Sequence, residues 1–100
     1  MDKDLNNLVY QVRRDILRMV HQAKSGHPGG SLGCTEFFIV MFNKILNFNL
    51  PFSIDGINED VFLLSNGPIS PVYYSILSRL GFFELNELKT FRKINSRLQG

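Results

Sequence analysis

The chain has 100 residues, a net charge of +2, and 44% apolar against 20% charged residues. This length allows one domain at most. Its basic residues form no block interleaved with aromatics and its longest apolar run, Phe37 to Phe42, cannot span a bilayer, so we expect neither a nucleic-acid partner nor a membrane partner. A single cysteine, Cys34, excludes an internal disulfide and a multi-thiolate metal site, and favours a reducing, cytoplasmic setting.

The first predicted element is an amphipathic helix from about Asp4 to Lys24. Apolar residues recur there at spacings of three and four, while the charged residues fall elsewhere on the helix. Gly26 ends it, because glycine readily takes a left-handed conformation. Two carboxylates, Asp15 on this helix and Glu36 on the next, are interpreted as solvated or salt-bridged surface groups.

A glycine-rich loop, GHPGGSLG, follows from Gly26 to Gly33. His27 precedes a proline, which disfavours a helical conformation, and a histidine is the side chain best suited to proton transfer at neutral pH. The alternative is an exposed loop histidine without a function. His21 carries no motif, and its separation from His27 matches no metal-ligand spacing. The loop also matches neither the phosphate-loop nor the dinucleotide-binding pattern.

Four further elements are predicted. A helix over 35–47 is apolar on almost every side, so we expect it to be buried on most sides, with cover from missing chain or a partner subunit. A surface connection, 49–60, precedes a short apolar strand, Val61 to Leu64, expected to be buried on both faces. A helix begins at Pro71 with Ser70 as its N-cap and ends at Gly81, and Asn86 caps a further short helix.

One strand among four helices does not complete an α/β domain, because an unpaired apolar strand leaves its backbone groups unsatisfied. We therefore expect an α/β fold, mostly helical with one buried strand. Residues 1–100 would then form the N-terminal part of a larger domain.

The order of several short motifs resembles the N-terminal part of the first domain of transketolase, a thiamine-diphosphate-dependent enzyme. AKSGHPGGSLG (23–33) follows RRDILRMVHQ (13–22). An apolar helix, a buried strand ending in LSNG (64–67), paired aromatics at 73–74 and ELKTFR (87–92) come next, in the family's order. The resemblance implies transfer of a two-carbon ketol unit between sugar phosphates in the pentose phosphate pathway, with thiamine diphosphate and magnesium as cofactors.

The same resemblance implies roles for two positions. His27 corresponds to a family histidine beside the cofactor's thiazolium, which contacts the substrate hydroxyl and helps to move its proton, so it is both the catalytic and the substrate-binding candidate. Pro68 stands where the family has a histidine directed at the diphosphate, so no cofactor-binding residue is assigned. The family's metal motif, Gly-Asp-Gly, does not occur in the sequence, so no metal ligand is assigned either.

Three hypotheses follow. The chain is part of a transketolase that functions with the rest of the enzyme or a second subunit, a homodimer for the full protein, and is inactive alone. Alternatively, it is a non-catalytic or decayed fragment that at most packs against another chain. In the third hypothesis it is a helical interaction module in which GHPG is accidental.

Overall fold

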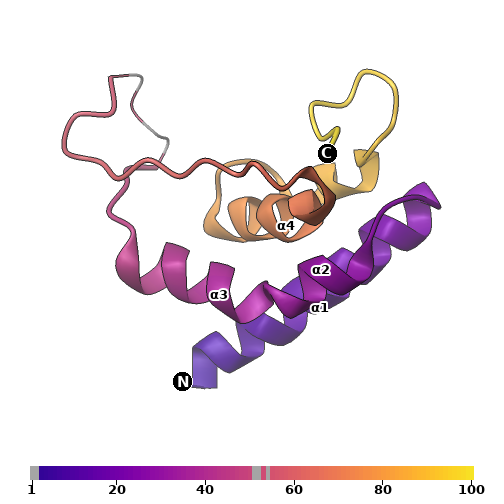
Figure 1. Cartoon of the computed structure of the whole chain (residues 1–100), viewed down its shortest axis with the longest axis horizontal. Coiled ribbons are helices and arrows are strands. Elements are labelled where there is room, and N and C mark those ends of the chain that lie inside the picture. Colours follow the sequence, from indigo (N-terminus) through magenta and orange to yellow (C-terminus); the bar gives the residue numbers. More distant parts are fainter. Residues whose placement is uncertain (1–2, 51–52, 54) are drawn as a thin grey trace.

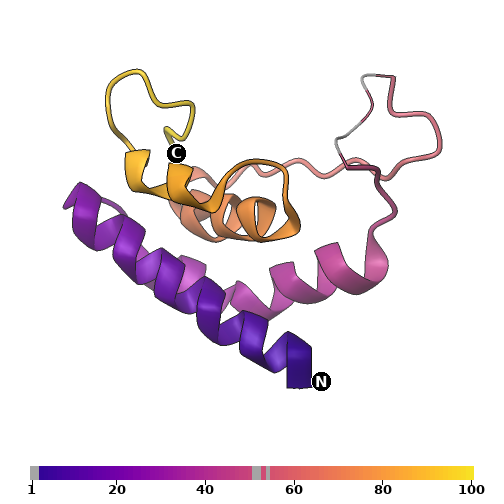
Figure 2. The same cartoon turned by 180° about the vertical axis from the view of Figure 1, so that it is seen from behind.

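The computed structural model describes residues 3–50, 53 and 55–100, and it places the helices in two layers (Figure 1). The lower layer holds the first three helices, and the fourth lies across them with the final short helix beside it, as the reverse view also shows (Figure 2). The elements are α1 (Lys3–Ala23), α2 (Pro28–Gly33), α3 (Thr35–Val40), the π-helix η1 (Met41–Ile45), the 3-10 helix η2 (Gly67–Ile69), α4 (Ser70–Leu80) and the 3-10 helix η3 (Leu85–Thr90).

Helix α1 is amphipathic, as predicted, and it packs against α4. Its inward residues Val9, Val12 and Ile16 are buried, and each such side chain stabilises the fold by roughly 1.5–3 kcal/mol. Lys24, directly after the helix, has a φ of 52°, and Gly26 has a φ of 121°. The helix therefore ends close to the predicted position, but Lys24, and not Gly26 as predicted, takes the left-handed conformation directly after it.

Two hydrophobic clusters hold the layers together. The larger lies between α1, α3 and α4, with Phe38, Ile39 and Ile76 at its centre and an aromatic group around them. The smaller joins the end of α1 to η3 and to the last ten residues, and it consists of Met19, Leu88, Phe91 and Leu98. The C-terminal segment is thus part of the packed structure.

The helix predicted over 35–47 forms, but as six residues of α-helix followed by a π-helical turn. Its predicted burial on most sides is only partly correct. Phe38 and Phe42 are buried, whereas Phe37 is 58% and Ile45 is 61% exposed, because α1 and α4 cover one side of the helix only.

The predicted buried strand, Val61 to Leu64, does not form. Across residues 3–50, 53 and 55–100 the structure contains no β-strand, and this segment runs as an extended chain beside α4 (Figure 1). Phe62 and Leu64 pack on the larger cluster, whereas Val61 and Leu63 are 74% and 87% exposed. A strand requires a neighbour for its backbone N–H and C=O groups, and none of the described segments supplies one.

The short helix predicted after Asn86 is present as the 3-10 helix η3, but it begins at Leu85 with Glu84 at the cap position, so the prediction that Asn86 caps it is wrong. No helix in the described part of the chain combines the length and apolar character that a membrane crossing requires.

Candidate functional site: the histidine loop and the start of α4

His27 is exposed and extended, with φ −126° and ψ 93°, at the junction between α1 and α2. This agrees with the expectation for a residue that precedes a proline. The predicted loop continues differently, because Pro28 begins a short helix, α2, where a proline is favoured at the first position. His27 therefore lies in a short linker of four residues between two helices, rather than in a long glycine-rich loop.

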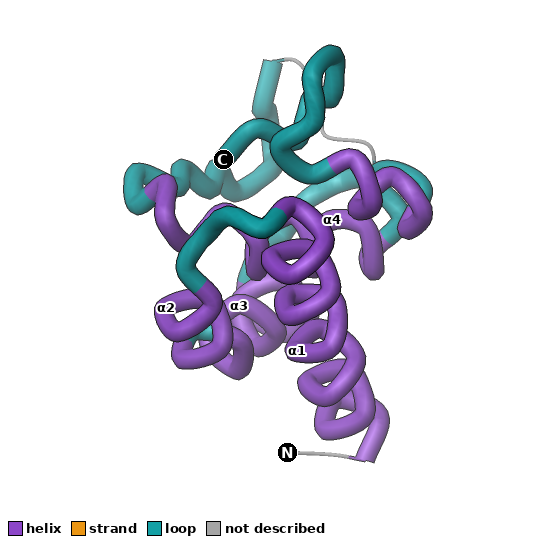
Figure 3. The backbone as a smooth tube through the Cα atoms, turned by 90° about the vertical axis from the view of Figure 1, so that its right-hand side faces the viewer, coloured by secondary structure: helices purple, strands orange, loops and turns teal. Residues whose placement is uncertain are grey.

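The two motifs that the sequence singled out lie against each other. An added Cβ at Gly30, in GHPGGSLG, would lie 2.8 Å from Cγ2 of Ile69, two residues after LSNG. Only glycine allows α2 to approach η2 this closely. Seen from the side, α2 lies next to α1 and below the start of α4 (Figure 3). The histidine linker and the turn containing Pro68 are thus joined through α2.

Ser31 connects the two motifs by a hydrogen bond. The backbone N–H of Val72, in the first turn of α4, donates to the Ser31 hydroxyl oxygen at 3.3 Å, and both residues are fully buried. The hydroxyl of Thr35 donates in turn to the Ser31 carbonyl at 3.0 Å. A residue of α2 therefore caps α4, in the way that an N-cap side chain normally caps its own helix.

The predicted N-cap role of Ser70 is wrong. Helix α4 includes Ser70 as a helical residue, and Ile69 at the cap position has no side-chain hydrogen bond to the helix. Within the part of the chain that the structure describes, the buried Ser70 hydroxyl has no hydrogen-bond partner. A residue already in helical conformation cannot turn its side chain back to the N–H groups of the next turn.

The start of α4 offers few donors to an anion. Pro68 and Pro71 have no N–H, the N–H of Ile69 donates to the Asn66 carbonyl at 3.1 Å, and that of Val72 is taken by Ser31. A helix N-terminus binds phosphate through free N–H groups, and here most of them are missing or used. The described residues at this turn therefore do not fit the diphosphate of a thiamine cofactor.

The two single carboxylates differ in their surroundings. Asp15 is buried, and it accepts two hydrogen bonds from Arg79, at 2.7 and 2.8 Å, and one from Ser75 at 2.8 Å. The hydrogen bond to Asp15 raises the pKa of Arg79. Asp15 is therefore salt-bridged, as expected, but the prediction that it lies on the surface is wrong. Glu36 pairs with Arg13 at 2.7 Å on the surface, as predicted.

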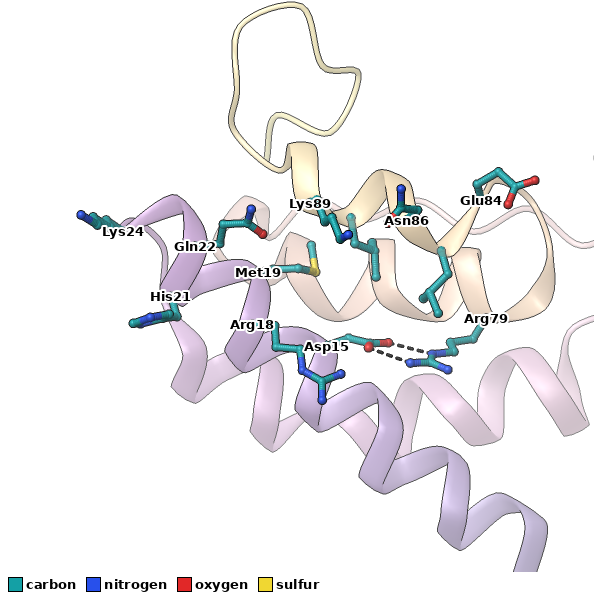
Figure 4. A pocket seen from close by; sticks show the side chains of 12 residues that line it. Asp15, Arg18, Met19, His21, Gln22, Lys24, Arg79, Glu84, Asn86 and Lys89 are labelled. Atoms are coloured by element: carbon teal, nitrogen blue, oxygen red, sulfur yellow. Dashed lines mark hydrogen bonds and ion pairs between the residues drawn. The ribbon is translucent and has the colours of Figure 1, made fainter.

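A hollow of about 850 Å³ opens between the second half of α1 and η3 (Figure 4). Met19 and Leu88 form part of its lining, and the Asp15–Arg79 pair closes one end. His21 is among its lining residues but points away from Lys89, and His27 is not among them. The hollow is thus separate from the histidine linker. None of the described residues form a cluster of three or more groups that could hold a metal ion.

The comparisons with known proteins assign the chain to a family. A family model described as "Transketolase, thiamine diphosphate binding domain" matches residues 5–100. The chain belongs to the transketolase family. The hypothesis of an unrelated helical module with an accidental GHPG sequence is therefore excluded.

Curated transketolases align along almost the whole chain. The transketolase of Aquifex aeolicus (strain VF5) is 36% identical over 100 residues, covering 98% of this chain and 14% of that protein. Transketolase 2 of Escherichia coli (strain K12) is 37% identical over 99 residues, with the same coverage of both chains. The transketolase of Staphylococcus epidermidis (strain ATCC 12228 / FDA PCI 1200) is 42% identical over 89 residues, covering 89% of this chain and 13% of that protein. The chain thus spans about one-seventh of the length of these transketolases.

Proposed function

We propose that residues 1–100 supply the N-terminal part of a thiamine-diphosphate-binding domain, and that this part contributes His27 to a transketolase reaction completed by other segments. The single observation that supports this proposal most is the family match over residues 5–100. The geometry agrees with it, because α2, which directly follows the histidine linker, packs against the turn that follows LSNG.

In the proposed reaction, His27 exchanges a proton with a hydroxyl of a sugar phosphate. An imidazole suits this step because its ordinary pKa lies near neutral pH. The linker presents His27 at the surface, and none of the described side chains engages its imidazole by a hydrogen bond. The side chain is therefore available to a substrate bound between this chain and another segment or subunit.

The cofactor, with its magnesium ion, would be held mainly by those other segments. The start of α4 has few free N–H groups, and Pro68 has no donor to offer a diphosphate. We infer that the chain alone neither binds thiamine diphosphate nor transfers ketol units.

The exposed extended segment supports a role for a further chain segment. Val61 and Leu63 expose most of their surface, while the residues between and after them pack on the core. This alternation is typical of a strand with one covered face. We propose that the predicted strand forms when the rest of the family domain, or a second subunit of a homodimer, pairs with residues 61–64.

The second candidate function is that of a non-catalytic fragment that only packs against another chain. Pro68 and the occupied N–H groups of α4 favour this reading. The two proposals differ in whether His27 takes part in chemistry.

A fusion enzyme distinguishes them. This chain would replace the matching segment of E. coli transketolase 2, and ketol transfer would be measured with saturating thiamine diphosphate and Mg²⁺. The catalytic proposal predicts activity that falls by about 100-fold in His27→Ala. It predicts little change in His21→Ala, because His21 is exposed and the proposal assigns it no role.

The chain alone provides the second arm of the test. Isothermal titration of the chain with thiamine diphosphate and Mg²⁺ should give no binding, and the same sample should show no ketol transfer. Micromolar binding would show that the site is complete without further segments, and loss of all activity in the fusion would favour the packing role.

A further inference from the structure

The last ten residues pack against the linker that carries His27. Phe91 is buried in the smaller hydrophobic cluster, and an added Cβ at Gly26 would lie 3.9 Å from its ring and 3.3 Å from a methyl group of Val20. The Phe91 ring therefore lies next to the backbone of the residue that precedes His27. Gly26 also has a φ of 121°, a backbone conformation that residues with a side chain rarely adopt.

Arg92 makes the polar part of the same contact. One N–H of its guanidinium donates to the Ser25 hydroxyl, across 67 positions of sequence. Two others donate to the carbonyl oxygen of Gly100, at 2.9 and 3.3 Å, and the guanidinium lies 5.7 Å from the centre of the Phe91 ring. Arg92 thus joins the linker before His27 to the far end of the C-terminal segment.

The backbone of Arg92 is also held in an unusual conformation. Its φ is 63°, and its N–H donates to the Leu98 carbonyl at 2.8 Å, which closes the segment into a loop. Leu98 is 3% exposed and anchors that loop in the smaller cluster. A left-handed conformation at a residue other than glycine persists only where its surroundings hold it. The loop therefore presents the guanidinium to Ser25 in one orientation.

We propose that Arg92 is a positioning residue for His27, and that it acts by fixing Ser25 and Gly26. The proposal rests on the proposed function only for what His27 does, because the contact itself is independent of any activity. Proton transfer depends on placing the acid or base within a fraction of an ångström. Without the Arg92 contact, glycine at position 26 leaves the linker free to move.

Arg97 provides a matched control. Its guanidinium makes two hydrogen bonds to the Glu87 carboxylate and, like that of Arg92, lies close to a phenylalanine ring, 5.4 Å from the centre of Phe83. Its partners belong to η3 and to the turn before it, and none belongs to the histidine linker. Loss of Arg97 therefore removes similar interactions without touching Ser25.

The test is limited trypsin digestion of the 100-residue chain under native conditions, with the fragments followed by mass spectrometry. The Lys24–Ser25 bond reports the mobility of the linker. Arg92→Ala should raise the cleavage rate at Lys24 by roughly tenfold. In the wild type the linker must break the guanidinium contact before it can open, and in this variant it need not. Arg97→Ala should leave that rate at the wild-type value.

Ser25→Ala separates positioning from a general structural role. It removes the bond to Arg92 but leaves the contacts of Arg92 with Gly100 and Leu98 intact, so a purely structural arginine would be unaffected. We expect faster cleavage at Lys24 with unchanged cleavage at Lys93, which lies inside the C-terminal loop. If Arg92→Ala and Ser25→Ala were both cleaved at Lys24 at the wild-type rate, the proposal would be overturned. Because digestion needs no activity, an inactive fusion enzyme would refute the proposed function and leave this result standing.

Discussion

The Ser31 hydroxyl of α2 accepts the N–H of Val72 and so caps α4 from a different helix, 41 residues earlier in the sequence. This bond joins α2, which directly follows His27, to the first turn of α4, which follows the turn that carries Pro68. Both partners are fully buried, so water cannot replace the bond when it is lost.

Ser31→Ala should lower the free energy of unfolding by about 1 kcal/mol, because it leaves the Val72 N–H without a partner. Urea denaturation followed by circular dichroism measures this change. Ser70→Ala is the matched control, since the Ser70 hydroxyl is buried without a partner in the described chain. That variant should be as stable as the wild type or more stable, and equal losses in the two variants would contradict the assignment of the cap.

Gly30→Ala tests the close approach of α2 to η2. The added methyl group would lie 2.8 Å from Ile69, so we expect a loss of about 1–3 kcal/mol in the free energy of unfolding. Gly29→Ala is the control, because nothing lies within 4 Å of its added Cβ. Since alanine favours a helix over glycine, Gly29→Ala should stabilise the chain by roughly 0.5–1 kcal/mol. A stable Gly30→Ala variant would show that the two motifs are further apart.

Asp15→Ala tests the buried ion pair between α1 and α4. Removal of one member of a fully buried pair costs roughly 3–5 kcal/mol. We expect about 2 kcal/mol here, because the Arg79 side chain is 21% exposed and can reach water. Glu36→Ala removes a similar pair on the surface and should cost less than about 0.5 kcal/mol. Thermal and urea denaturation of both variants provides the comparison. Equal effects would place Asp15 in a solvated setting.

The sequence predicted those parts of the fold that depend on local patterns. The spacing of Val9, Val12 and Ile16 placed α1 correctly, and the position of His27 before Pro28 predicted its extended backbone. These features follow from residues that are close in sequence, so no knowledge of the partners was needed.

The features that were missed depend on partners far away in sequence. Ser70-Pro71 is a typical start of a helix, yet the cap comes from Ser31, and no local pattern distinguishes the two serines. The burial of Asp15 depends on Arg79 and Ser75 of another helix. The strand at 61–64 has the right residues, but a strand forms only with a neighbour, and its pattern does not reveal whether one is present.

The sequence predicted the two motifs of the candidate site but not how they are arranged in space. The family resemblance pointed to His27 and Pro68, and the structure adds that α2 connects them. Arg92 carried no signal of its own, because it stands in ELKTFR, in the stretch that the sequence predicts as a short helix. The only available signal was its place in a motif that the family shares.

The central proposal is that this chain supplies the histidine linker of a transketolase but, with Pro68, offers no contact to the cofactor diphosphate. The most direct test is the thiamine diphosphate affinity of the fusion with E. coli transketolase 2, measured by isothermal titration in the presence of Mg²⁺, with Pro68 and with Pro68→His. We predict that the histidine raises the affinity by about tenfold or more, the gain expected from one charge-assisted hydrogen bond. Equal affinities in the two fusion proteins would contradict the alignment at this turn and the account of the site.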